Sequence, residues 1–173
     1  MSDASGTTNL QDHFEITTLI SGFFRVMDER RFDEGWADAY VTDDLRTTTP
    51  IGVADGADAV RHVEVAIGRF AATQHVSSDV VVRHEPGGRT AHVRWNAHMT
   101  HVHPDSTLQA RGAGANPLFT VGGVYEGEFR RTDHGWRVSR MSVRAVWTTG
   151  EPPVLPEDVA TRVAERTGAR AAG

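Results

Sequence analysis

The sequence predicts a single α+β domain in which helices come first and an antiparallel sheet follows. Its 173 residues, 39% of them apolar, are enough for one compact domain with a sizeable core. Apolar residues recur at helical spacing up to about residue 72, whereas the chain after residue 75 consists of runs rich in Val, Thr and aromatic residues. Helices followed by consecutive strands are typical of a sheet that packs one face against the helices.

The first 72 residues carry three predicted helices and one short strand. A polar tail over residues 1–9 precedes an amphipathic helix expected over residues 10–30, where apolar residues repeat on one face. A short second helix is expected to begin near Asp33, and a strand is expected over residues 46–49. The third helix follows Asp58 and is expected to end near residue 72. All three helices therefore precede the main sheet.

Four consecutive strands make up the rest of the predicted domain. They are separated by turn-forming clusters and are expected over residues 75–84, 89–103, 118–131 and 136–148. Their order along the chain predicts an antiparallel meander. A Pro-rich connection, a short helix and a loose tail are expected over residues 151–173, which leaves residues 10–150 as the domain.

Composition excludes several classes of function. The net charge is −5 and basic residues run no longer than pairs, so a surface that tracks nucleic-acid phosphates is not expected. All 18 basic residues are Arg and there is no Cys, which excludes Schiff-base lysine chemistry, thiolate nucleophiles and cysteine metal sites. No stretch approaches the roughly 20 apolar residues of a membrane span, and no signal-peptide pattern opens the sequence. A cytoplasmic protein without a membrane partner is therefore expected.

Asp28 and His75 are the first candidates for chemistry. Asp28 lies at the C-terminal end of the first predicted helix, where the helix dipole disfavours a carboxylate, so another group is expected to stabilise it. His75 lies where the third helix gives way to the first meander strand. Two plainer interpretations stay open: Asp28 as a solvated residue paired with Arg31, and His75 as a buried structural histidine.

A second cluster of candidates lies in the strand expected over residues 89–103. The three histidines at its end, His98, His101 and His103, invite a metal site, but alternate residues of a strand face opposite sides, so His98 points away from the other two and no metal is expected. His101 and His103 are then interpreted as a polar strand end. Asn96 and His98 share a face and are candidates to line a pocket. Which face is inward stays open, because the opposite set is the more apolar: Trp95, Ala97 and Met99.

The order of these features resembles that of a known family. A helix ending in Val26-Met27-Asp28, His75 at the start of the meander, and the late pattern from Gly122-Gly123-Val124-Tyr125 to Val138 resemble the SnoaL-like branch of the nuclear transport factor 2-like superfamily over residues 10–150. The resemblance implies a cone-shaped fold, in which a curved antiparallel sheet is wrapped by three N-terminal helices around an apolar pocket. It also implies acid–base chemistry without a cofactor, in subunits that commonly associate as homodimers or homotrimers.

The resemblance further implies roles for individual residues. Asp28 and His75 match the Asp–His dyad of enzymes in the family. His98 matches a second active-site histidine, Tyr125 a pocket aromatic residue and Arg140 a pocket arginine.

The sequence also departs from the family pattern. Phe23 stands where related enzymes carry Tyr or Lys, five residues before the dyad aspartate, and the strand tyrosine expected near residues 47–49 is missing. A leaving-group acid used by relatives is therefore absent. Phe23 is instead expected to belong to an apolar substrate wall together with Met27, Phe70 and Trp147.

These residues predict a dehydratase, isomerase or cyclase that acts on a hydrophobic carbonyl compound, such as a polyketide or another natural product. Asp28 would orient His75, whose Nε2 removes a proton beside the carbonyl. The candidates to stabilise the resulting enolate are Asn96, His98, Tyr125 and Arg140. The alternative is a non-catalytic ligand-binding or assembly subunit, like the small subunit of ring-hydroxylating dioxygenases, in which Asp28 does not reach His75. An epoxide hydrolase would need an Asp-Arg-Asp set that the sequence does not assemble.

Overall fold

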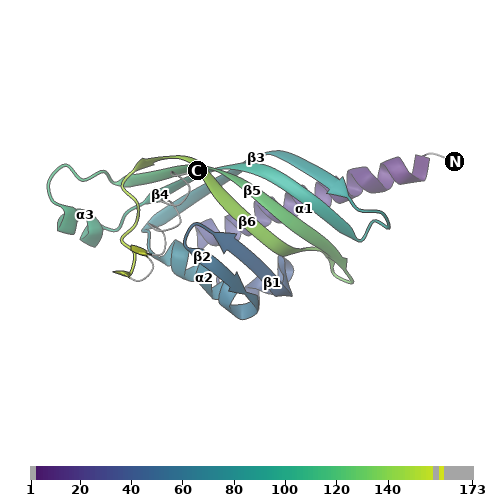
Figure 1. Cartoon of the computed structure of the whole chain (residues 1–173), viewed down its shortest axis with the longest axis horizontal. Coiled ribbons are helices and arrows are strands. Elements are labelled where there is room, and N and C mark those ends of the chain that lie inside the picture. The colour runs from purple at the N-terminus through teal and green to yellow at the C-terminus, as the bar shows by residue number, and fades with distance from the viewer. Residues whose placement is uncertain (1–2, 158–159, 162–173) are drawn as a thin grey trace.

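The computed structural model describes residues 3–157 and 160–161 of the chain (Figure 1). In chain order its elements are α1 (Asp3–Glu29), the 3-10 helix η1 (Trp36–Ala39), β1 (Val41–Thr49), β2 (Gly52–Asp55), α2 (Gly56–Gly68), β3 (Ala72–His84), β4 (Thr90–Val102), α3 (Asp105–Arg111), β5 (Leu118–Thr132) and β6 (Gly135–Gly150). Over the described residues, three α-helices and an open six-stranded sheet form an α+β fold of the predicted cone-like class.

The sheet has the strand order β2-β1-β6-β5-β4-β3. Strands β3 to β6 form the predicted antiparallel meander. Strand β1 pairs in parallel with β6, with Thr47 beside Met141, and β2 folds back on β1 as a short antiparallel edge. The sheet is therefore mixed, whereas the sequence predicts antiparallel pairing. The difference arises because α2 and the meander separate β1 from β6 along the chain, and a parallel neighbour needs such a long connection.

Irregular pairing bends the sheet around α1. The register shifts in β3 between Ser78 and Val81, and twice between β5 and β6, next to Gly122 and Glu128. Bulges of this kind increase the local twist of a strand. Helix α1 crosses the inner face of the curved sheet and packs on β3 and β6, while α2 packs on β1 and β2 (Figure 1).

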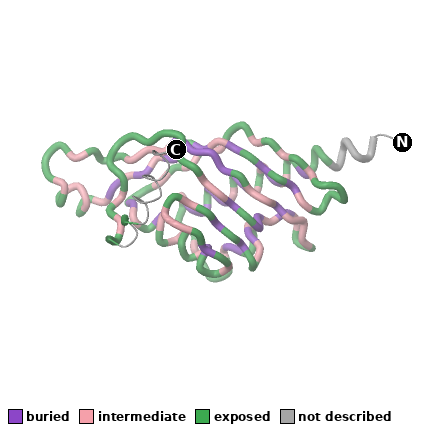
Figure 2. Tube along the Cα trace, viewed as in Figure 1, coloured by how far each residue is buried: buried purple, intermediate pink, exposed green. Residues whose placement is uncertain are grey.

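The core lies between α1 and this inner face. Strand β4 alternates between buried residues and more exposed ones along its length (Figure 2). Its buried set is Ala91, Val93, Trp95, Ala97, Met99 and His101. The facing residues of α1 are Ile16, Ile20, Phe23, Phe24 and Met27. The more apolar set of β4 therefore faces the core. The alternation along the strand could not show which of its two faces is inward.

Some helices differ from those predicted. Helix α1 begins at Asp3, so residues 3–9 are helical rather than a separate tail, because a nucleated helix extends readily through a segment without proline. The short second helix is a single 3-10 turn, η1. Helix α3 was not predicted; it follows Pro104 and has Asp105 in its first turn and Arg111 in its last, where both charges favour the helix dipole.

The predicted C-terminal helix and tail fall largely on residues 158–159 and 162–173, outside the described residues. Within the part of the chain that is described, no helix is both long and apolar enough to cross a membrane.

Candidate active site

Asp28 and His75 are in direct contact, although 46 positions separate them. Nδ1 of His75 lies 2.6 Å from Oδ1 of Asp28. The backbone N–H of His75 donates to Oδ2 of the same carboxylate at 2.8 Å, and the hydroxyl of Thr73 donates to Oδ1 at 2.8 Å. One histidine therefore holds both oxygens of the carboxylate, through its ring and through its own backbone.

The end of α1 fixes the position of Asp28. Arg30 ends the helix in the left-handed region with φ 53°, and the N–H groups of Arg30 and Arg31 close the last turn on the carbonyls of Met27 and Val26. The Arg30 guanidinium also donates to the carbonyls of Ile67 and Phe70, just after α2. Asp28 is therefore presented to β3 from a helix end that is anchored on two sides.

The environment keeps the Asp28 carboxylate charged. Burial alone would raise the pKa of Asp28, but hydrogen bonds from the ring and backbone of His75, the charge of that ring and the hydroxyl of Thr73 outweigh it and hold the pKa below its ordinary value. A carboxylate only accepts hydrogen bonds, so the Nδ1 that faces it carries the proton and Nε2 of His75 carries the lone pair. No hydrogen bond to this Nε2 is formed by the residues that the structure describes.

Burial of the dyad is uneven. The His75 side chain is 4% exposed and the Asp28 side chain is 20% exposed, so solvent reaches the pair from the carboxylate side. Two clefts in the described structure, of about 590 and 440 Å³, are lined by other residues. Neither of these two clefts borders the dyad.

His101 also belongs to this site, although its position in the sequence predicted only a polar strand end. Its ring meets that of His75 edge to face, with centroids 5.6 Å apart, and packs on Phe70 at 4.4 Å. Nδ1 of His101 donates to the carbonyl of Phe119 at 3.0 Å. Burial lowers the pKa of His101 to about 4, so at neutral pH the ring is uncharged and its Nε2 carries a lone pair.

Aromatic residues enclose the two histidines. Phe24 packs on His75 with ring centroids 5.2 Å apart, and Tyr125 packs on Phe24 at 5.6 Å. The Tyr125 hydroxyl donates to Sδ of Met99 at 3.4 Å, and burial raises the pKa of Tyr125, so the phenol keeps its proton. Tyr125 therefore lies near the dyad, as predicted, although its hydroxyl is directed at a sulfur atom.

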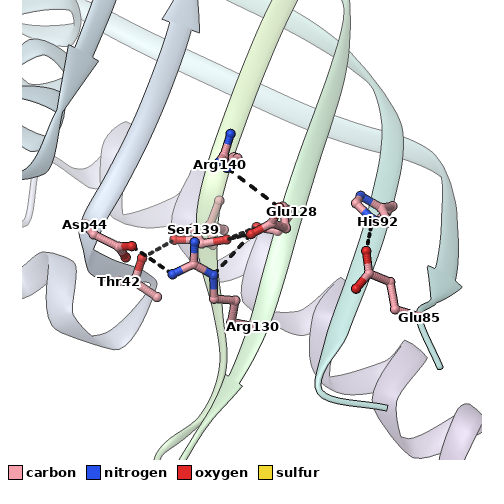
Figure 3. A network of polar contacts seen from close by, with 9 residues as sticks. Thr42, Asp44, Glu85, His92, Glu128, Arg130, Ser139 and Arg140 are labelled. Carbon is pink, nitrogen blue, oxygen red and sulfur yellow. Dashed lines mark hydrogen bonds and ion pairs between the residues drawn. The ribbon is translucent and has the colours of Figure 1, made fainter. Parts of the chain in front are cut away.

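Three predicted site residues lie on the opposite face of the sheet. His98 is exposed and packs beside Trp147, with ring centroids 5.6 Å apart. Asn96 donates to Oδ2 of Asp79 at 2.8 Å. Arg140 projects from β6 toward Glu128 on that outer face (Figure 3). The correction has one cause: residues that alternate with the buried set of a strand point away from the core.

The predicted apolar wall is also corrected in part. Phe23 is buried, but it packs on Trp36 and Tyr40, and its neighbour Phe24 contacts His75 instead. Trp147 is 47% exposed and lies flat over Gly122 on the outer face, where a Cβ on that glycine would come within 2.2 Å of the indole. Met27 and Phe70 are buried on the dyad side of the sheet, as expected.

The described residues offer no group of three or more His, Asp or Glu side chains placed to hold a metal ion. His103, the last histidine of the run, is buried and donates from Nε2 to the carbonyl of Glu151 at 2.9 Å. It therefore anchors the connection after β6.

One known protein family matches this sequence. The sequence matches the model of the SnoaL-like domain over residues 8–142, which includes both dyad residues and His101. The chain belongs to the SnoaL-like domain family. No curated protein matches this SnoaL-like chain.

Several solved structures share the fold of this SnoaL-like protein. Kfla4162 from Kribbella flavida is 21% identical with a TM-score of 0.72, and covers 82% of this chain and 95% of its own. A proposed scytalone dehydratase from Novosphingobium aromaticivorans is 21% identical with a TM-score of 0.69, covering 88% and 97%. The hexachlorocyclohexane dehydrochlorinase LinA-type3 from Novosphingobium barchaimii is 18% identical with a TM-score of 0.68, covering 87% and 99%. At these identities the similarity establishes the fold alone.

Proposed function

We propose that this SnoaL-like protein is an acid–base enzyme that eliminates water from a hydrophobic carbonyl compound, with Asp28 and His75 as its catalytic dyad. One observation carries the proposal: the carboxylate of Asp28 accepts bonds from both the ring Nδ1 and the backbone N–H of His75. Such a contact selects the tautomer with a basic Nε2 and stabilises the imidazolium that forms when Nε2 takes a proton.

The first step is removal of a proton from the carbon beside the substrate carbonyl. Nε2 of His75 takes this proton, the C–H electron pair passes into an enolate, and Asp28 balances the new positive charge on the ring. The surrounding apolar residues strengthen that electrostatic interaction because they lower the local dielectric constant. Loss of a β-hydroxyl from the enolate then forms the carbon–carbon double bond and restores the carbonyl.

The leaving hydroxyl needs a proton, and among the described residues around the dyad one donor fits. Phe23 has no acidic group, the Tyr125 hydroxyl is bonded to Met99, and His101 is uncharged because burial lowers its pKa to about 4. The His75 imidazolium holds the abstracted proton and can return it to the departing oxygen on the same face of the substrate. His101, through its Nε2 lone pair, accepts a hydrogen bond from that hydroxyl before it leaves and so orients it.

The surroundings of the dyad favour an apolar, ring-shaped substrate. Phe24 and Phe70 pack on the two histidines, and Met27 and Met99 complete an unbranched, adaptable wall. A bicyclic ketone of the polyketide type fits this chemistry. The names of two structural neighbours, a dehydratase and a dehydrochlorinase, denote the loss of water and of HCl, reactions that also begin with removal of a proton from carbon.

The main alternative is a non-catalytic binding or assembly subunit. That hypothesis expects Asp28 to stay out of reach of His75, and the 2.6 Å contact argues against it.

The test uses 3-hydroxy-1-tetralone, a bicyclic β-hydroxy ketone that loses water to give 1-naphthol, followed by fluorescence. The parallel readout is exchange of the α-protons of 1-tetralone in D₂O, followed by NMR. We expect both activities in the protein, a loss of at least about a hundredfold in Asp28→Asn and His75→Gln, and little change in the control His98→Gln, which alters an exposed histidine on the outer face. Equal rates in all four proteins would remove the dyad from the mechanism.

A further inference from the structure

The larger cleft of the protein lies on the outer face of the sheet, away from the dyad. It measures about 590 Å³ and is lined by outward residues of five strands, from β1 to β3 across β6, β5 and β4. Its charged residues comprise two glutamates, Glu126 and Glu128, and four arginines: Arg46, Arg83, Arg94 and Arg140. The cleft is therefore positively charged in a chain whose net charge is −5.

One of the two glutamates of the cleft, Glu128, already has bonded partners. Glu128 accepts hydrogen bonds from the Ser139 hydroxyl at 2.8 Å and from Nε of Arg130 at 3.1 Å, and Arg130 also bonds Asp44 at 2.8 Å (Figure 3). The hydroxyl of Ser139, together with the charge of Arg130, holds the pKa of Glu128 below its ordinary value. This network ties β1, β5 and β6 into a fixed side of the cleft.

The arginines differ in how far they are engaged. Arg46 binds both carboxylate oxygens of Asp55 through its Nη1, at 2.9 and 3.0 Å. Arg140 forms a long ion pair of 3.7 Å with the already bonded Glu128, and Arg94 forms one of 4.0 Å with Glu126, its partner in the β4–β5 pairing; both exceed hydrogen-bond distance. Arg83 forms no ion pair with any of the residues that the structure describes. The arginines with the weakest carboxylate contacts, Arg83 and Arg94, are therefore on the β3–β4 side of the cleft.

Strand pairing brings two of these arginines together. Arg83 of β3 pairs with His92 of β4, and Val81 pairs with Arg94, so Arg83 and Arg94 are diagonal neighbours on one face. Diagonal neighbours in a sheet lie roughly 7–8 Å apart, within the reach of two guanidinium groups that converge on one anion. Arg140, two strands away from Arg94, faces the same cleft.

We propose that this outer cleft binds a small organic anion, with its phosphate or carboxylate group held between Arg83 and Arg94 and opposite Arg140. A guanidinium matches the two oxygens of either group with parallel N–H bonds. The volume of the cleft exceeds that of the anionic group alone, so the rest of the ligand extends toward the paired Thr48 and Ser142 hydroxyls of β1 and β6. The site is independent of the dyad because the two lie on opposite faces of the sheet.

Isothermal titration calorimetry with pyrophosphate and with citrate, at constant ionic strength, tests the site and distinguishes phosphate from carboxylate recognition. We expect saturable binding of at least one of the two, weakened about tenfold in Arg83→Gln and in Arg94→Gln, as loss of a charge-assisted hydrogen bond implies. Arg61→Gln on α2 is the matched control, since it removes the same charge from a site that is 69% exposed and outside the cleft. Melting temperatures and dehydration activity should stay unchanged in all three variants.

The proposal is overturned if neither anion binds, or if Arg61→Gln weakens binding as much as Arg83→Gln does. Sedimentation velocity provides the remaining distinction. If Arg83→Gln separates associated copies of the chain and the associated form binds no anion, the cleft is an interface between copies rather than a ligand site.

Discussion

The ring of His101 meets the ring of His75 edge to face at 5.6 Å. His75 is bonded to a carboxylate, whereas His101 is bonded to the carbonyl of Phe119 and buried. Burial and the nearby charge of His75 both disfavour a proton on His101. The two neighbouring imidazoles therefore differ: the buried ring of His101 is uncharged at neutral pH, whereas the ring of His75 has the Asp28 carboxylate beside it.

Protonation of His101 predicts how stability depends on pH. Burial lowers its pKa from 6.5 to about 4 in the folded protein, so between these pH values the unfolded chain binds a proton that the folded chain does not. The free energy of unfolding therefore falls as pH decreases from 6.5 to about 4, by about 3 kcal/mol from this residue. In His101→Gln this part of the slope should disappear, as measured by urea unfolding at a series of pH values. The control His134→Gln, an exposed histidine in the β5–β6 turn, should keep the slope.

Thr73 is expected to act as a positioning residue for the dyad. Its hydroxyl donates to Oδ1 of Asp28 at 2.8 Å and helps to lower the pKa of that carboxyl group. Thr73→Val should raise the pKa of Asp28, move the acid limb of the pH–rate profile to higher pH and lower kcat roughly tenfold, because a bond to a charged group is lost. Thr73→Ser keeps the hydroxyl and should restore the profile. An unchanged acid limb in Thr73→Val would exclude this role.

A buried ion pair fixes the other end of α1. Asp12 is 5% exposed and pairs with Arg131, whose guanidinium lies 4.7 Å from the centre of the Trp136 ring, and Nδ1 of His84 lies 4.0 Å from Asp12. Asp12→Asn leaves Arg131 with only the partly exposed Glu15, 3.9 Å away, and should lower the free energy of unfolding by about 2–3 kcal/mol, measured in urea. The matched Asp58→Asn removes an exposed pair and should cost less than about 1 kcal/mol. Equal losses would show that burial does not strengthen the Asp12 pair.

The contrast between His98 and His101 shows how far sequence reasoning reaches. Helical spacing and the Val-, Thr- and aromatic-rich runs after residue 75 were sufficient to predict α1 and the meander, whereas the pairing of Asp28 with His75 was expected from the family resemblance. Along β4 the period of two predicts which residues share a face. It does not predict which face is buried, because that depends on the packing of α1 against the sheet. This contact joins residues that are far apart in sequence. The apolar residues Trp95, Ala97 and Met99 could have identified the buried face from the sequence. His101 lies on the same face as this set, whereas Asn96 and His98 lie on the opposite face. Strand β2 and the parallel pairing of β1 likewise depend on contacts that no local pattern contains.

The assignment of the proton donor can be tested at Tyr125. If its phenol protonated the leaving group, removing the hydroxyl would remove a donor that acts in the transition state, and such losses cost about a hundredfold or more in rate. The structure instead directs this hydroxyl to Sδ of Met99 at 3.4 Å, a weak acceptor in the packed core. Tyr125→Phe keeps the ring that stacks on Trp95 at 5.0 Å and should therefore retain the melting temperature and keep dehydration of 3-hydroxy-1-tetralone within about fivefold. A hundredfold loss at an unchanged melting temperature would transfer the acid role from the His75 imidazolium to Tyr125.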